Sequence, residues 1–272
     1  MKKIISVLLL AVLCLGLVAC GASAPAASDK LILGTSADYA PFEFMYADDK
    51  GDMQYAGIDV SVAGYIAENM GKELQVENMA FDYLLTALGK GDYDIVIAAM
   101  ESTEERQLAA DFSDPYYTDI PAMILVKAAD ADQYKSLADF AGKNVGAQTA
   151  TTKLDIVNND MAGANAVALQ NVNDLVNELA YDKLDAVVLD GAVAMEFANA
   201  NPDMVIADAS AELGEAAPYC VAVQKGDPKG LLPGINAAIA KMVEENAVED
   251  FIALADELSG VAVEVSVDAP EE

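Results

Sequence analysis

LLTALGKGDYDIVIA, residues 84–98, and LVNELAYDKLDAVVLD, residues 175–190, follow the same plan. In each stretch, apolar residues at helical spacing are followed by a tight turn and then by a short apolar run typical of a buried β-strand. Aligning the two stretches places Ala99, just beyond the first, on Asp190. The pattern predicts an α/β unit that occurs twice.

A second pair of stretches extends this repeat. LILGTS, residues 31–36, is echoed by NVGAQT, residues 144–149, and the same alignment places Asp94 on Asp185. Alternating helices and strands predict parallel strands with helices on both faces of the sheet. Ligands of such sheets bind beyond the carboxyl ends of the strands. We therefore expect two lobes whose strand ends face one cleft, the alternative being chance similarity between two ordinary α/β units.

The composition excludes several classes of protein. The 272 residues carry 15 Lys and Arg against 45 Asp and Glu, a formal charge of −30, and no His. Nucleic-acid binding needs clustered basic residues, so it is excluded as a function. Without His there is no serine-type triad, no Cys–His dyad and no His-ligated metal site. Hydrophobic residues make up 54% of the chain, which favours a packed globular protein over a disordered acidic one.

Seven stretches, in this order, resemble the polar amino-acid solute-binding proteins of ABC importers. They are GTSADYAPFEF (34–44), AGIDVSVAGYIAENMGKELQ (56–75), FDYLLTALGKGDYDIVIAAM (81–100), STEERQLAADFSDPYY (102–117), VGAQTATT (145–152), LDAVVLD (184–190) and VAVQKGD (221–227). The resemblance covers roughly residues 30 to 255. It implies an α/β fold of the periplasmic-binding-protein type, a two-lobed clamshell in which each lobe is a mixed, mainly parallel sheet flanked by helices.

The resemblance also implies a domain organisation in which the chain crosses twice between the lobes. Both expected crossings contain Pro or turn residues, which suits hinge segments. The expected parts are a lipoprotein signal peptide (1–19), a lipid anchor and tether (20–28), lobe 1 (29–118 and 219–260), lobe 2 (122–214) and an acidic C-terminal tail (261–272).

Two charged residues match the positions that hold the ligand in proteins of this kind. Arg106 is the only arginine of the chain, and its planar guanidinium suits a carboxylate; the resemblance implies that it binds the ligand's α-carboxylate. The alternative is a surface ion pair with Glu104 or Glu105. By resemblance, Asp190 accepts from the ligand's α-ammonium, and the alternative is an N-cap of the following helix.

Five further residues match the family's ligand-binding positions. Thr151 and Thr152 correspond to the hydroxyl-bearing loop that helps to hold the carboxylate, with capping of the next helix as the alternative. Tyr39 and Phe42 correspond to the aromatic residues that cover the ligand's side chain, with the lobe core as the alternative, above all for Phe42. Ser36 lies in the loop after the first strand and is also expected at the site.

Three residues depart from the family's pattern. Ala99 replaces a frequent Ser or Gly, although its backbone carbonyl remains able to accept a hydrogen bond from the ligand's ammonium. Glu101 stands where Ser or Thr is usual, and we expect it either to pair with Arg106 in the empty protein or to reach a cationic ligand side chain. Ala150 replaces a usual glycine, which alters how closely the backbone can approach the ligand.

The N-terminus reads as a targeting segment. Lys2 and Lys3 precede an apolar run, residues 4–18, that is too short to span a bilayer comfortably. LVAC, ending at Cys20, resembles the lipobox of bacterial lipoproteins, which implies a lipid (palmitate) on Cys20. The alternative is an ordinary signal peptide that is cut after Ala19 or Ala22.

Together these observations predict an extracytoplasmic lipoprotein that captures a free amino acid, neutral or cationic, and delivers it to an ABC importer. Its expected partners are the ABC permease with its ATPase, and the membrane through the lipid on Cys20; no nucleic acid, cofactor or metal is implied, and we expect a monomer at the cell surface or in the periplasm. Two alternatives stay open. One is an extracytoplasmic dehydratase-like enzyme on the same fold, and the other is a structural lipoprotein without a ligand.

Overall fold

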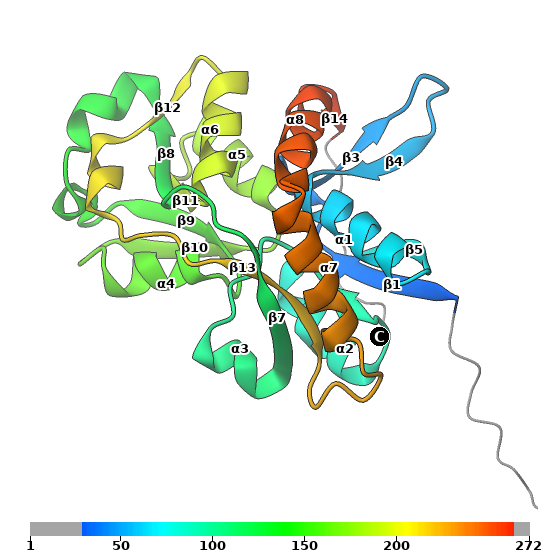
Figure 1. Cartoon of the computed structure of the whole chain (residues 1–272). Helices are drawn as coiled ribbons and strands as arrows, with labels where there is room; N and C mark the ends of the chain where they lie inside the picture. Colours follow the sequence, from blue (N-terminus) through cyan, green and yellow to red (C-terminus); the bar gives the residue numbers. More distant parts are fainter. Residues whose placement is uncertain (1–28, 264–272) are drawn as a thin grey trace, which may run out of the picture.

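The computed structural model describes residues 29–263, and these form two lobes side by side (Figure 1). Each lobe is built on a five-stranded sheet, and no strand is shared between the two sheets. The chain crosses from lobe 1 to lobe 2 between Tyr117 and Met123, and returns between Ile206 and Tyr219. The predicted signal peptide and tether lie outside the described residues.

Lobe 1 contains a sheet of order β5-β1-β6-β13-β7 and a smaller sheet formed by β2, β3, β4 and β14. In the main sheet four strands run in one direction and β13 runs opposite to them. Helices α1, α7 and α8 lie together on one side, and α2 packs on β6 and β13. The bounds are β1 Lys30–Thr35, β2 Asp38–Tyr39, β3 Glu43–Ala47, β4 Met53–Ala56, α1 Ile58–Asn69, β5 Glu73–Asn78, α2 Leu84–Lys90, β6 Ile95–Val96, α3 Glu104–Ala109, β7 Ala110–Tyr117, β13 Tyr219–Gln224, α7 Leu232–Glu244, α8 Ala247–Ser259 and β14 Ala262–Val263.

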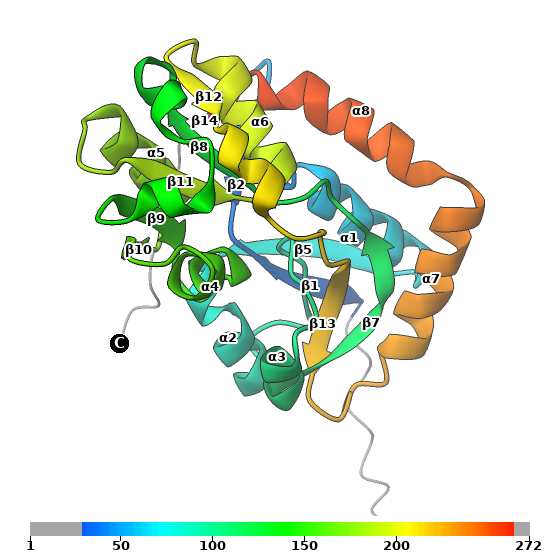
Figure 2. The same cartoon turned by 90° about the vertical axis from the view of Figure 1, so that its left-hand side faces the viewer.

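Lobe 2 repeats this topology with the order β10-β9-β11-β8-β12, in which β8 alone runs opposite to the others. Helix α4 covers one face of the sheet, and α5 and α6 pack on the opposite face (Figure 2). The bounds are β8 Met123–Lys127, β9 Asn144–Gln148, α4 Thr152–Asn159, β10 Asn165–Leu169, α5 Val172–Ala180, β11 Ala186–Leu189, α6 Gly191–Ala200 and β12 Met204–Ile206. The mixed, mainly parallel sheets that the sequence predicts are confirmed in both lobes.

The two copies of the repeat share an equivalent hydrogen bond at the start of a central strand. Asp94 precedes β6, and its carboxylate accepts from the backbone N–H of Ile32 at 2.8 Å. Asp185 precedes β11, and its carboxylate accepts from the backbone N–H of Asn144 at the same distance. The two strand ends are therefore equivalent in position, as the repeat predicts. The equivalence sets Ile32 on Asn144, one residue away from the letter-by-letter match of the two stretches.

Local sequence accounts for the elements that carry the repeat. In α1, Ile58, Val62 and Ile66 recur at helical spacing and are buried against lobe 1. Gly71 follows the helix with a φ of +67°, a conformation that glycine adopts at little cost. In lobe 2, all four residues of β11 are buried, as a central strand covered on both faces requires.

The C-terminal boundary differs from the one expected. Ala262 and Val263 pair with Met45 and Tyr46 of β3, so these two residues belong to the small sheet of lobe 1. The expected tail therefore does not begin at residue 261, because main-chain pairing with an edge strand holds the chain to that point. In the part of the chain between residues 29 and 263, no helix is both long and apolar enough to span a membrane.

Candidate ligand-binding site

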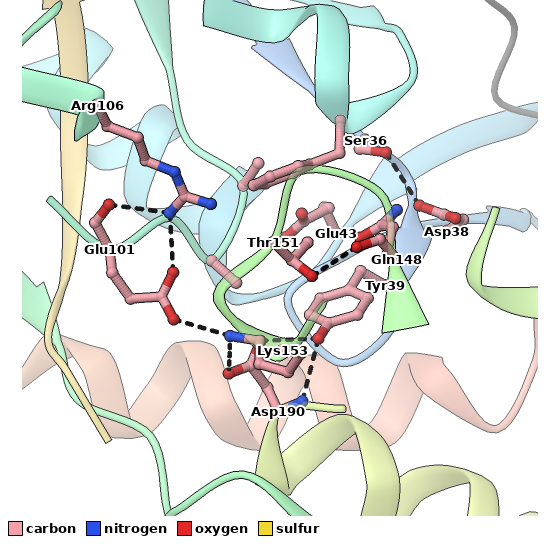
Figure 3. Close-up of a pocket in the computed structure, with 13 residues that line it drawn as sticks. Ser36, Asp38, Tyr39, Glu43, Glu101, Arg106, Gln148, Thr151, Lys153 and Asp190 are labelled. Carbon is pink, nitrogen blue, oxygen red and sulfur yellow. Dashed lines mark hydrogen bonds and ion pairs between the residues drawn. The ribbon is translucent and has the colours of Figure 1, made fainter. Parts of the chain in front are cut away.

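A small cavity lies between the lobes, at the carboxyl ends of β1, β6, β9 and β11 (Figure 3). Its free volume is about 10 Å³, room for about one water molecule. Both lobes line it. The lining residues are Ser36, Asp38, Tyr39, Glu43, Phe81, Ala98, Ala99, Glu101 and Arg106 from lobe 1, and Gln148, Thr151, Lys153 and Asp190 from lobe 2.

The lobes touch across this cavity through hydrogen bonds, so the structure is the closed arrangement. The Tyr39 hydroxyl donates to Asp190 at 2.7 Å. The backbone N–H of Val172 donates to Asp38 at 2.7 Å, and Gln170 donates to Asp82 at 3.0 Å. Closure thus aligns side chains that are more than 80 residues apart in the sequence.

Arg106 lies in the short helix α3, whose N-cap Thr103 accepts from the Arg106 backbone N–H. Its Nη1 donates to the carboxylate of Glu101 at 2.9 Å and to the Glu101 carbonyl at 3.0 Å. Its Nη2 reaches across the cleft to the carbonyl of Ala150 at 3.1 Å. The guanidinium carbon also lies 5.2 Å from the centroid of the Phe81 ring, within the range of a cation–π contact.

The alternative of a surface ion pair for Arg106 is wrong. The side chain is 10% exposed, and its ion-pair partner is Glu101 rather than Glu104 or Glu105. The first of the two roles expected for Glu101, a pair with the arginine, is therefore the one that the structure shows. Helix α3 turns the two other glutamates away from the cavity, since neither lines it.

Asp190 ends β11 and occupies the N-cap position of α6, but its side chain makes no capping hydrogen bond. Instead its Oδ2 accepts from the Tyr39 hydroxyl at 2.7 Å and its Oδ1 accepts from the Lys153 ammonium at 2.6 Å. Asp190 thus occupies the N-cap position of α6, as the alternative expects, but its carboxylate does not cap the helix. The carboxylate faces the cavity and already holds a cation.

The two threonines of lobe 2 differ in role. Thr151 caps α4, accepting from the Leu154 N–H at 3.3 Å, and lines the cavity. Thr152 donates across the cleft to Glu101 at 2.8 Å and lines the neighbouring hollows rather than the cavity itself. Ala150 adopts a φ of +61°, so the loop is left-handed at this position, a conformation of higher energy for alanine than for glycine.

The remaining expected residues lie as follows. Ser36 lines the cavity and donates to Asp38 at 3.0 Å. Ala99 also lines the cavity. It has a φ of +43°, and its backbone N–H donates to the Asp59 carboxylate at 2.6 Å. Phe42 is fully buried and does not line the cavity. Its ring packs on two tyrosine rings of the lobe 1 core, so the core alternative holds for Phe42 and we do not carry it into the site.

Six lining residues were not singled out from the sequence: Asp38, Glu43, Phe81, Ala98, Gln148 and Lys153. Five of them lie within the stretches that carry the family resemblance, and Lys153 follows directly. Two signals were available. An acidic residue inside an otherwise apolar stretch, as at Glu43, is a candidate for a buried polar role. A lysine directly after a cleft loop, as at Lys153, is a candidate for the cleft itself.

Glu101 and Lys153 form the electrostatic centre of the site. The Lys153 ammonium donates to Glu101 at 2.8 Å and to Asp190 at 2.6 Å. Burial alone would raise the pKa of Glu101, but the charges of Lys153 and Arg106 outweigh it and lower that pKa to about 2. Burial lowers the pKa of Lys153, yet Asp190 and Glu101 raise it above its usual value. Both groups are therefore ionised at neutral pH.

The lobe 1 wall of the cavity holds carboxyl groups of the opposite behaviour. Burial raises the pKa of Asp38 to about 6 and raises that of Glu43 well above its usual range. Glu43 also shares a hydrogen bond with Asp59, whose pKa burial raises to about 6. The Oε2 atom of Glu43 is buried without a hydrogen-bond partner. Among residues 29–263, no lysine or arginine forms an ion pair with Asp38 or Glu43 in this wall.

A metal centre is not what these acids form. Among residues 29–263, no group of three or more Cys, Asp or Glu side chains is arranged to hold a metal ion. The lone thiol of the described chain, Cys220, is buried in β13 away from the cavity lining, and burial raises its pKa to about 11. The cavity chemistry is thus that of two opposed charges at one end and buried acids at the other.

Comparison with known proteins places this site in a family. Residues 31–253 match the model of the bacterial extracellular solute-binding proteins, family 3. The arginine-binding extracellular protein ArtP of Bacillus subtilis is 33% identical over 92% of this chain and 96% of its own length. A probable histidine-binding protein of Campylobacter jejuni is 32% identical over 88% and 93%.

A solved structure agrees with these relatives. The amino acid ABC transporter substrate-binding protein AbpA of Streptococcus pneumoniae, crystallised with L-arginine, superposes with a TM-score of 0.80 at 33% identity, covering 85% of this chain and 96% of that one. The fold of this chain agrees with that of the solved structure. This chain belongs to the bacterial extracellular solute-binding proteins of family 3.

Proposed function

We propose that this protein captures a cationic amino acid, arginine first, outside the cytoplasm and hands it to an ABC importer. The observation that carries the proposal is one cavity lined by Arg106 and Asp190 from opposite lobes and by the buried carboxyls of Asp38 and Glu43. The first pair suits the two charges of an amino acid's backbone. The second pair suits a positive charge at the far end of its side chain.

The backbone charges of the ligand explain why the closed form is the one that binds it. A guanidinium binds a carboxylate through two parallel hydrogen bonds, and Asp190 offers a charge-assisted acceptor to an ammonium. Arg106 belongs to lobe 1 and Asp190 to lobe 2. Only the closed form lets both meet one ligand out of water, so the ligand is bound in that form.

The side chain of the ligand would meet the acidic wall. Glu43 carries an unpartnered buried oxygen, and an unmade hydrogen bond of this kind costs about 1–3 kcal/mol. A guanidinium or ammonium end supplies the missing donor and a counter-charge. Phe81 lines the same cavity and offers an apolar face to the ligand's methylene groups. Arg106 is the only arginine, so none remains for a side-chain carboxylate, which disfavours glutamate and aspartate.

The relatives support this choice of ligand class. ArtP is named for arginine, the Campylobacter jejuni protein for histidine, and AbpA holds L-arginine in its crystal. Within the expected class of neutral or cationic ligands, the buried acids on lobe 1 support a cationic one. An enzyme on the same fold stays the second candidate in class, and no feature of the cavity favours it.

Delivery and anchoring complete the proposal. The family works outside the cytoplasm, and we propose a monomer that docks in its closed form on an ABC permease with its ATPase. The lipid anchor at Cys20 rests on the lipobox alone. Replacing Cys20 by alanine is expected to move the protein from the membrane fraction to the medium or periplasm, as read by fractionation and immunoblot. A protein that stays on the membrane would refute the anchor.

Titration calorimetry with single amino acids tests the ligand class. Arginine is expected to bind most tightly. Citrulline has the same shape without the charge and should bind roughly ten- to a hundredfold more weakly, because a hydrogen bond to a charged group contributes about 1.5–3 kcal/mol. Glu43→Gln should lose this preference, whereas the matched change at exposed Glu73 should keep it.

Three outcomes would contradict the proposal. If no amino acid binds, the receptor function fails. If citrulline binds as tightly as arginine, the cationic ligand class fails. If Arg106→Ala binds as well as the parent protein, the carboxylate assignment is wrong. Steady consumption of the bound compound would instead support the enzyme.

A further inference from the structure

Glu101 and Lys153 make together the contacts that an amino acid's backbone charges would make. The Glu101 carboxylate lies between Arg106 Nη1, at 2.9 Å, and Thr152 Oγ1, at 2.8 Å. The Lys153 ammonium lies on Asp190 Oδ1, at 2.6 Å. The two charges are joined to each other at 2.8 Å (Figure 3).

We propose that this ion pair is an internal substitute for the ligand's zwitterionic head group, that it holds the ligand-free cleft closed, and that the ligand must displace it to bind. The inference rests on the proposed function, because it takes Arg106 and Asp190 as the groups that receive the ligand. It concerns two residues that the family resemblance does not explain. Glu101 stands where Ser or Thr is usual, and Lys153 was not expected in the site.

The pair links the two lobes. Glu101 belongs to lobe 1, while Lys153 and Thr152 begin helix α4 of lobe 2. The Glu101 and Lys153 side chains are 9% and 6% exposed, so their attraction acts with little screening by solvent. Opening the cleft separates the Glu101 carboxylate from the Lys153 ammonium and from the Thr152 hydroxyl. The closed form therefore has an internal bridge whose contacts resemble those of a ligand.

The free volume shows that the bridge and a ligand exclude each other. With the pair in place, the cavity leaves about 10 Å³, far less than an amino acid needs. Arg106, Thr152 and Asp190 are all engaged by the pair. A ligand that binds these groups has to take over their contacts one for one.

An adjoining hollow offers Lys153 a place to go. This hollow has a volume of about 260 Å³ and is lined by Lys153 itself together with Asp160 and Glu215. A rotated Lys153 side chain can direct its ammonium there, toward carboxylates or water, while its backbone stays in α4. The exchange keeps the buried charges balanced, because the ligand brings one carboxylate and one ammonium to the groups that the pair leaves.

The pair sets the apparent affinity. A ligand-free protein that spends 90–99% of its time closed on its own ion pair has about 1–10% of molecules ready to bind, which weakens the apparent Kd by about ten- to a hundredfold. Removing the pair removes this competition. A receptor tuned in this way binds only when its ligand is abundant enough to win the exchange.

Calorimetry with arginine measures the competition directly. The variants are Lys153→Met, Glu101→Thr, which restores a hydroxyl residue at that position, and the double variant. The double variant is expected to bind arginine about tenfold or more tightly than the parent. Lys183→Met is the matched control in the same lobe, where an exposed lysine pairs with Glu178 away from the cleft. The Kd of this variant for arginine should equal that of the parent.

X-ray scattering without ligand measures the closure and needs no variant for its first reading. The parent should give the compact, closed radius of gyration before arginine is added, and little change after. The ligand-free double variant should be more extended and should contract when arginine is added. Circular dichroism of each variant verifies that it is folded, and Glu101→Thr alone gives the test if Lys153→Met does not fold.

The outcomes separate this inference from the proposed function. An open ligand-free parent, or a double variant that binds arginine no more tightly than the parent, overturns the inference and leaves the receptor function standing. If neither the parent nor any variant binds an amino acid, the proposed function itself is wrong. Tighter binding by the double variant together with its opening supports both.

Discussion

Asp38 and Glu43 are buried carboxyl groups that face the cavity with raised pKa values, about 6 for Asp38 and well above the usual range for Glu43. Burial is the main cause in both, and no lysine or arginine is paired with either side chain among residues 29–263. A cationic ligand end would supply that charge. It would favour the ionised carboxylates and so lower both pKa values.

This difference predicts that arginine binding depends on pH. Because the carboxyls hold protons more tightly in the ligand-free protein than beside a cation, binding releases protons, and affinity rises as the pH increases from 5 to 7.5. The rise should reach up to about tenfold per pH unit for each proton released. Calorimetry in two buffers of different ionisation enthalpy counts those protons. An affinity that falls with pH, or proton uptake, would contradict the acidic wall as the cation's place.

At the scale of elements, each copy of the repeat relies on a glycine that packs closely against a side chain. A Cβ at Gly34 of β1 would lie 2.3 Å from the Tyr93 ring, and a Cβ at Gly146 of β9 would lie 2.6 Å from Leu184. Tyr93 and Leu184 each directly precede the equivalent aspartates of the two copies. The glycines thus keep strand and turn at the spacing that brings both strand ends to the cleft.

Gly34→Ala is therefore expected to destabilise the protein. The whole Tyr93 ring would have to shift, and overpacking of this kind costs about 1–3 kcal/mol. Gly64→Ala is the matched control, since it lies within α1 with nothing within 4 Å of its new Cβ, and should be neutral or stabilising by up to about 1 kcal/mol. Urea unfolding of both variants makes the comparison. Equal stabilities would show that β1 adapts and that the close packing is not required.

At the scale of the whole molecule, three buried aspartates make the stability of the protein depend on pH. Burial raises the pKa values of Asp38, Asp59 and Asp119 to about 6. Asp119 lies in the first crossing between the lobes and accepts from the Ala192 N–H at the start of α6. These groups bind protons more tightly folded than unfolded, so the free energy of unfolding should fall as the pH rises through 4 to 6.

The ligand-free protein is thus predicted to be more stable at pH 5 than at pH 7.5. Each of the three carboxyls contributes about 1 kcal/mol of this difference, and fewer like charges on a chain of net charge −30 act in the same direction. Glu101, with a pKa of about 2, becomes important only below about pH 4. Thermal unfolding should show a Tm several degrees higher at pH 5.

Two variants locate the source of that difference. Asp119→Asn should reduce it, because asparagine keeps the hydrogen bond to Ala192 and removes the proton. Asp132→Asn, at a fully exposed side chain, should leave it unchanged. A Tm that is equal at the two pH values, or lower at pH 5, would show that these buried carboxyls do not control the stability.

The amino-acid sequence by itself indicated a repeated α/β unit in two lobes, and its resemblance to a known family implied the two crossings and the candidate roles of Arg106 and Asp190. Helical periodicity and apolar strands are local properties, so the sequence predicts the elements. The repeat predicts the same arrangement in both copies, and Asp94 and Asp185 do precede equivalent strands. The single arginine left one candidate for a bidentate carboxylate clamp. These inferences need no knowledge of which side chains meet.

Only the tertiary structure decided what those groups touch. Phe42 and Tyr39 are three residues apart, yet one enters the core and the other the cavity. Lys153 meets Asp190 of its own lobe across 37 residues of chain, and it meets Glu101 of the other lobe across 52 residues and only with the lobes closed. Burial also raised the pKa of Glu43 well above its usual range. The reason is physical: hydrogen bonding, burial and charge pairing in a cleft depend on how two separately folded lobes meet, and no local pattern of residues encodes that distance.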